Sequence, residues 1–143
     1  MSKLGLQVAA EPEQLKVVRA YLHDELQPLL ADEKTTFRLV LAVDEACQNI
    51  IRHAFSNTQG ALLILLSHTK ICLTINLYDN GDVDLLTPLA PVKPLPESAD
   101  TMSPGGLGLH IIDQVFDEWG FVTSDNVNFC HQMQLIYHKV DPK

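Results

Sequence analysis

The sequence has few of the features that would send a chain to a membrane or out of the cell. Its longest unbroken apolar run covers residues 61–66, far short of the roughly 20 residues that a membrane-spanning helix requires. The opening stretch, MSKLGLQVAA, is followed at once by Glu11, Pro12 and Glu13 and does not match a secretory signal. We therefore expect a cytoplasmic protein with no membrane segment.

Cysteine is also scarce. The three cysteines, Cys47, Cys72 and Cys130, are odd in number and far apart, with none of the paired spacings of zinc sites or dithiol chemistry. We expect buried free thiols in a reducing compartment, and no metal held by thiolates.

Positive charge is limited as well. Ten Lys and Arg face 18 Asp and Glu, which gives a net charge of −8, and no basic cluster offsets it. This balance disfavours nucleic acid as a partner, because a polyphosphate backbone would be repelled. A single nucleotide is compatible with an acidic chain, since backbone N–H groups and a metal ion can meet its phosphates.

The composition that is present suits one compact domain over residues 1–143. The chain is 46% hydrophobic and 20% charged, as expected for a globule with a single core. Alternating and helical patterns predict the following elements: a strand over 4–9, a helix over about 12–26, a helix over 31–55, strands over 61–67 and 71–78 joined as a hairpin, a helix over 106–116, and strands near 118–123 and 129–138.

Two of these helices have clear core-facing stripes. Asp32 is the expected cap of the helix over 31–55. In the first helix the predicted stripe is Leu15, Val18 or alternatively Val17, Leu22 and Leu26, and in the second it is Phe37, Val40, Val43, Cys47, Ile50 and Ala54.

A proline-rich loop covers about 81–105 and holds five of the eight prolines. Structureless connections of that length are uncommon inside compact domains unless they act as lids or binding loops. A lid and plain disorder are both compatible with this composition.

The first stretch that can carry chemistry is EACQNIIRHA, in which Glu45, Asn49 and His53 share one helix face. An ordinary solvated polar face is one interpretation. In the other, Asn49 gives one oxygen to an octahedral Mg²⁺ and Glu45, one turn away, acts as a base.

The second stretch is Asp79-Asn80-Gly81, directly after a predicted strand. An Asx-Gly pair there is often only a turn. Alternatively, the carboxylate accepts a hydrogen bond from the exocyclic amine of adenine, and Gly81 lets a flat ring approach the backbone.

The third stretch runs through Gly105, Gly106, Leu107, Gly108 and Leu109, between the proline-rich loop and a helix. Glycines at a helix start can expose N–H groups that favour phosphate, whereas a flexible hinge is the simpler interpretation. No Lys-Ser or Lys-Thr follows the glycines, so the segment is not a P-loop, and its spacing differs from a dinucleotide fingerprint.

Taken together and in this order, the three stretches resemble the GHKL ATPases, and within them the anti-sigma-factor serine kinases. LAVDEACQNIIRHAF looks like the N-box of that family, YDNG like its first glycine box, and PGGLGLHIIDQVFDEW like its second. The resemblance implies an α+β fold: a two-layer α/β sandwich of the Bergerat type, with a mixed, mostly antiparallel sheet covered by about three helices and ATP under a mobile lid.

The resemblance also implies roles and partners. Glu45 matches the general base, Asn49 the Mg²⁺ ligand and Asp79 the residue that reads adenine. The cofactor-binding set carried over for ATP or ADP is Asn49, His53, Asp79, Gly81, Gly105, Gly106, Leu107, Gly108 and Leu109. The implied partners are a STAS-domain anti-anti-sigma factor that is phosphorylated on serine, a sigma factor or other regulator that is sequestered, and a second copy in a homodimer.

The chain departs from the family pattern in two places. Val83 stands two residues after Gly81, where the family pattern often has a second glycine. No arginine follows Arg52, and Lys93 is the one cation of the predicted lid. Phosphoryl transfer depends on stabilising the γ-phosphate charge. A nucleotide-gated binding module without kinase activity, and an interaction domain that has lost its nucleotide, therefore stand beside the kinase as alternatives.

Overall fold

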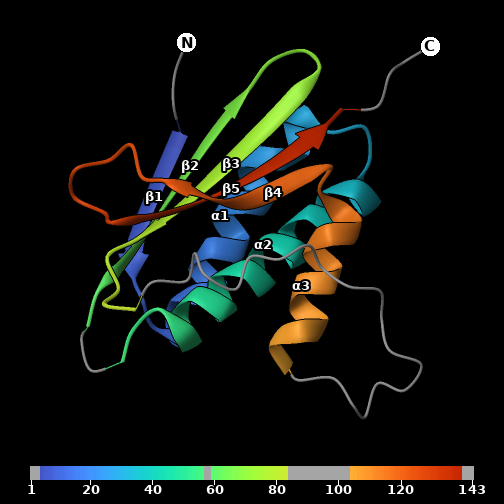
Figure 1. Cartoon of the computed structure of the whole chain (residues 1–143). Helices are drawn as coiled ribbons and strands as arrows, with labels where there is room; N and C mark the ends of the chain where they lie inside the picture. The colour runs from blue at the N-terminus through green and yellow to red at the C-terminus, as the bar shows by residue number, and fades with distance from the viewer. Residues whose placement is uncertain (1–3, 57–58, 84–103, 140–143) are drawn as a thin grey trace.

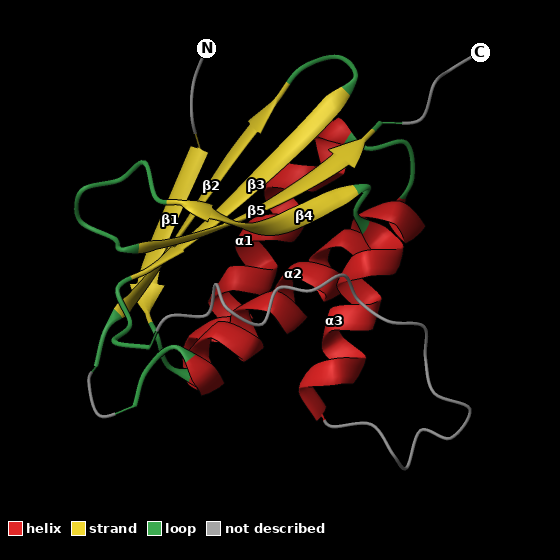
Figure 2. Cartoon of the chain, in the orientation of Figure 1, coloured by secondary structure: helices red, strands yellow, loops and turns green. Residues whose placement is uncertain are grey.

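The computed structural model describes residues 4–56, 59–83 and 104–139, apart from the side chains of Leu4 and of 104–109. Short 3-10 turns at Pro12–Gln14 and Gln27–Leu29 flank the first helix. The elements in chain order are β1 (Leu4–Ala9), α1 (Leu15–Leu26), α2 (Glu33–His53), β2 (Ala61–His68), β3 (Cys72–Asp79), α3 (Pro104–Val115), β4 (Glu118–Thr123) and β5 (His131–His138). One sheet and one layer of helices on one of its faces make up this α+β sandwich (Figures 1 and 2).

The sheet has the strand order β1-β2-β3-β5-β4, and all four neighbouring pairs are antiparallel. The predicted hairpin of β2 and β3 is confirmed. The last strand, β5, runs between β3 and β4, so the end of β3 lies beside the beginning of β5. In this register Asp79 is directly opposite His131, and this corner of the sheet forms part of the site described below.

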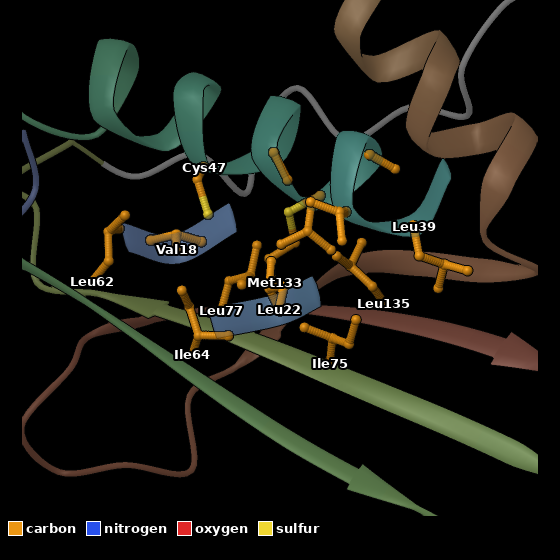
Figure 3. Packing of buried hydrophobic residues seen from close by; sticks show 14 of the residues in the cluster. Val18, Leu22, Leu39, Cys47, Leu62, Ile64, Ile75, Leu77, Met133 and Leu135 are labelled. Carbon is orange, nitrogen blue, oxygen red and sulfur yellow. The ribbon is translucent and has the colours of Figure 1, made fainter. Parts of the chain in front are cut away.

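The core lies between the sheet and the helices (Figure 3). Alternate residues of β2 and β3 are buried because successive side chains of a strand point to opposite faces. Each fully buried Leu or Ile contributes about 1.5–3 kcal/mol to stability. The side chains labelled in Figure 3 are Val18, Leu22, Leu39, Cys47, Leu62, Ile64, Ile75, Leu77, Met133 and Leu135.

Both long helices begin and end close to where the sequence predicts. Asp32 caps α2, since its Oδ1 accepts a hydrogen bond of 2.7 Å from the backbone N–H of Thr35. The predicted stripe of α1 that passes through Val18 is buried in full. Of the helices that the structure describes, none combines the length and the hydropathy needed to cross a bilayer.

The predicted core position of Phe37 is wrong, because its side chain is 61% exposed. The buried face of α2 passes through Leu39, Val43 and Ile50. Phe37 precedes Leu39 by two residues, about 200° around the helix, so the two side chains point to nearly opposite sides.

The prediction that all three thiols are buried is also wrong. All are free, but Cys47 alone is buried, Cys72 is half-buried and Cys130 is exposed. Cys130 lies in the connection that leads into β5 rather than on a core-facing position of a strand. Burial, with a smaller effect from the Asp44 carboxylate, raises the pKa of Cys47 to about 12.

Candidate functional site

Asp79 is the last residue of β3, and its side chain is 1% exposed. Its Oδ1 accepts a hydrogen bond of 2.9 Å from the backbone N–H of Gly81 and lies 2.7 Å from Nδ1 of His131. An ionised carboxylate can only accept, so Nδ1 is the donor in this pair. Within the described residues, Oδ2 has no hydrogen-bond partner.

Gly81 packs against the carboxyl end of α2. A Cβ at this position would lie 2.1 Å from the carbonyl oxygen of Ala54, the C-cap residue. That same oxygen accepts a hydrogen bond of 2.9 Å from the backbone N–H of Val83. The Asp82 carboxylate bonds both the backbone N–H and the hydroxyl of Ser56. The segment after β3 is thus fixed to the end of α2.

Asn49 lies five residues before Ala54, which is about 7.5 Å along the helix axis at 1.5 Å per residue. Its side chain is half-buried, and Oδ1 accepts a bond of 3.3 Å from Nη2 of Arg52. Its Nδ2 is buried, with no hydrogen-bond partner among the described residues. Buried polar groups are rarely left unpaired, so this amide suits a site that receives a polar ligand.

Glu45 and His53 lie one turn to either side of Asn49. Glu45 is half-buried, and its carboxylate has no hydrogen-bond or ion-pair partner in the part of the chain that the structure describes. His53 is exposed in the last turn of α2. Residues four apart in a helix drift by about 40° around the axis, so the three side chains follow a slanted row rather than one straight line.

The predicted glycine segment forms the first turns of α3, which begins at Pro104, two residues before the predicted start. The side chains of Gly105, Gly106, Leu107, Gly108 and Leu109 lie outside the described part of the chain, as do residues 84–103 of the predicted lid. α3 packs beside α2 on the same face of the sheet (Figure 2). In α3, Nδ1 of His110 is buried without a partner among the described residues.

Sequence reasoning missed His131 and the neighbouring Cys130. The Cys130 thiol donates weakly to the carbonyl oxygen of Gly81 at 3.4 Å, and it lies 3.6 Å from Nδ1 of His131. Only the pairing of β5 with β3 brings these two residues to Asp79. The strand pattern predicts both strands, but it contains no signal that they are neighbours.

The residues present fit a magnesium nucleotide. Oδ2 of Asp79 is an acceptor that suits an exocyclic amine, and the Gly81 backbone beside it is held against Ala54. The oxygen of the Asn49 amide is a ligand that Mg²⁺ accepts, and its unpaired buried Nδ2 can donate a hydrogen bond to a phosphate oxygen. Helix α3 opens with a glycine-rich turn, where backbone N–H groups favour phosphate.

Comparison with known proteins agrees with this geometry. The model of the histidine kinase-like ATPase domain matches residues 8–133. The serine-protein kinase RsbW of Bacillus velezensis is 26% identical, over 96% of this chain and 89% of its own length. RsbW of Listeria innocua is 30% identical over 81% and 76% of the two chains. The serine/threonine-protein kinase BtrW of Bordetella bronchiseptica is 33% identical over 64% and 65%. The chain therefore belongs to the histidine kinase-like ATPase family and, within it, to the group that contains the serine-protein kinases RsbW.

Proposed function

We propose that this chain is an ATP-dependent protein-serine kinase and anti-sigma factor of a partner-switching system. The observation that carries the proposal is the attachment of the Asp79–Gly81 segment to the end of α2, the helix with Glu45 and Asn49. This attachment brings two of the three sequence motifs to one corner of the fold. The relatives named as serine-protein kinases support the reaction type.

In this proposal each residue acts on a different part of the substrate. Asp79 accepts the hydrogen bond of the adenine amine through Oδ2, and Gly81 lines the base. Asn49 holds Mg²⁺, which supplies charge neutralisation at the phosphates when it is bound. Gly106 and Gly108 line the phosphate side, with Gly105, Leu107 and Leu109 in the same turns of α3 and His53 at the rim.

Glu45 is the proposed general base. It takes the proton of the incoming serine hydroxyl while the serine oxygen bonds to the γ-phosphorus and the bond from that phosphorus to the leaving oxygen of ADP breaks. A carboxylate with no protein partner is available for this proton. The acceptor serine belongs, in this proposal, to a STAS-domain anti-anti-sigma factor.

The remaining parts of the proposal follow from the resemblance. A sigma factor or other regulator is held in the other state of the switch, the working form is a homodimer, and the location is cytoplasmic. Neither the acidic net charge nor the proposed reaction calls for nucleic acid as a partner.

The second candidate is a nucleotide-gated binding module that transfers no phosphate. It is favoured by one observation: the last arginine of the sequence, Arg52, bonds Oδ1 of Asn49 at 3.3 Å. In that arrangement the Arg52 guanidinium is already bonded to a side chain of the site. Few other cations are then present to stabilise the charge of the γ-phosphate during transfer. Such a module binds ATP or ADP and selects its protein partner by which nucleotide is present.

Incubation with γ-labelled Mg-ATP and a STAS-domain partner tests the proposal. The unmodified chain should label the partner, and Glu45→Gln should reduce the rate about 100-fold or more while ADP binding is kept, because general-base catalysis contributes about 10²–10⁴. Glu25→Gln, a half-buried glutamate of α1, is the matched control and should leave the rate unchanged. Undiminished labelling in Glu45→Gln refutes the assigned base. Binding of ADP without any labelling favours the binding module.

A further inference from the structure

The side chains of Asp79 and His131 contact each other across two strands at the candidate site. The two residues are opposite each other in the antiparallel pairing of β3 and β5. Oδ1 and Nδ1 are 2.7 Å apart, and the side chains are 1% and 13% exposed. A charge-assisted hydrogen bond of this length with so little exposure is a strong one.

The Asp79 carboxylate is held at one oxygen only. Oδ1 receives both the Gly81 backbone N–H, at 2.9 Å, and the His131 imidazole. The first of these bonds fixes the position of the oxygen relative to the turn after β3, and the second fixes it relative to β5. Rotation of the carboxylate about its Cβ–Cγ bond would break both bonds, so Oδ2 is left in one orientation as an acceptor.

We propose that His131 is a specificity-determining positioning residue, which holds Asp79 so that Oδ2 is presented as a fixed acceptor and adenine is selected over guanine. This inference rests on the proposed nucleotide site, and the resemblance assigned no role to His131. The 6-amino group of adenine donates a hydrogen bond, whereas O6 of guanine accepts one. A fixed acceptor therefore binds the 6-amino group of adenine. In guanine it meets O6, which is also an acceptor, and no proton lies between the two oxygens.

Loss of the imidazole would leave the carboxylate held by the Gly81 bond alone, so that it could rotate about that bond. A carboxylate that rotates no longer presents Oδ2 at one place, and it loses most of its advantage for the 6-amino group of adenine over O6 of guanine. The selectivity of the site should then fall even where the affinity for adenine nucleotides is partly kept.

The test is the ratio of the Kd values for ADP and GDP, measured by calorimetry in the presence of Mg²⁺. The ratio separates the proposed role from a merely structural one, because a general loosening of the fold weakens the binding of both nucleotides by the same factor. His131→Ala should reduce the preference for ADP at least ten-fold. His131→Asn should restore most of it, since the amide nitrogen of Asn occupies nearly the place of Nδ1 and also donates.

His138→Ala is the matched control. His138 lies at the other end of β5, is exposed, and is 3.2 Å from the Glu118 carboxylate, so its loss should leave the ratio unchanged. If His131→Ala keeps the ratio of the wild type, or if the ratio in His131→Asn is as low as in His131→Ala, the role proposed for His131 is overturned. The proposed function is not affected by either result. If the unmodified chain binds neither ADP nor GDP, the proposed function fails together with this inference.

Discussion

Gly81 and Ala54 are so close that a methyl group on Gly81 would lie 2.1 Å from the carbonyl oxygen of Ala54. This contact joins the end of β3 to the end of α2, two segments that are far apart in the sequence. The carbonyl oxygen is occupied by the backbone N–H of Val83, and the backbone cannot move away without loss of that bond. The contact is thus a point where the fold and the candidate site depend on the same atoms.

Gly81→Ala should weaken Mg-ADP binding at least ten-fold and lower the free energy of unfolding by about 1–3 kcal/mol, the usual cost of overpacking. Gly120→Ala is the control, because a Cβ at that position of β4 meets no atom within 4 Å. Calorimetry and urea unfolding provide the two readouts. Normal ADP affinity in Gly81→Ala would show that this contact does not position the site.

The pair of Arg19 and Asp44 should stabilise the packing of α1 on α2. Asp44 is 5% exposed, and its carboxylate accepts from Arg19 at 3.1 Å and from Gln48 at 2.8 Å. Arg19→Ala leaves one oxygen of a buried carboxylate without its partner, which costs about 1–3 kcal/mol. Urea unfolding should show this loss, whereas Lys16→Ala, an exposed residue of α1, should change stability by less than about 0.5 kcal/mol. Equal stability of the two variants would contradict the assignment.

The three thiols should react at very different rates. The thiolate is the reactive form, and burial raises the pKa of Cys47 to about 12, so this thiol is both protonated and inaccessible in the native state. Cys130 is exposed and should be alkylated first by iodoacetamide at pH 8, with Cys47 modified only after unfolding. Mass spectrometry of the native protein checks the order, and Cys130→Ser should remove the fastest phase. Early labelling of Cys47 would contradict the buried core position.

Tyr78 should make the stability fall at high pH. Burial, followed by its hydrogen bond to Asp125, raises the pKa of Tyr78 to about 12. The folded state therefore prefers the protonated phenol, so the stabilisation is complete below the ordinary value near 10 and is lost as the pH rises toward 12. The loss at pH 12 is about 2 kcal/mol from this group.

Tyr78→Phe separates this group from the others that titrate in the same range. Denaturant unfolding at each pH measures the difference in unfolding free energy between wild type and variant. This difference should narrow or change sign between pH 9 and 12. A difference that stays constant over that range would contradict the assignment to Tyr78.

Much of the fold could be predicted from the sequence because the signals are local. The Asp32 cap and the hairpin of β2 and β3 depend on residues that are close in the chain, and both predictions are confirmed. The same holds for the motif residues Asp79 and Gly81, which stand together after a strand. Their resemblance to a known family identified them, and the contact with Ala54 gives the physical reason for the glycine.

What the sequence could not provide is which distant segments become neighbours. His131 reaches Asp79 only because β5, and not β4, is the neighbour of β3 in the sheet, and no periodicity encodes that pairing. The pattern places Phe37 wrongly because amphipathicity is averaged over a whole helix, while the buried face of α2 is set by its packing against α1 and α3 and by the core that it shares with the sheet.

In the proposed site, Asn49 and Asp79 bind the two ends of one magnesium nucleotide. Calorimetric titration of ADP into wild type and into Asn49→Ala, each with Mg²⁺ and with EDTA, measures whether the metal is held by Asn49. Wild type should bind ADP more tightly with Mg²⁺, and Asn49→Ala should bind with nearly the same affinity in both conditions. A wild type that does not bind Mg-ADP, or an Asn49→Ala variant with the full Mg²⁺ dependence of wild type, would contradict the account.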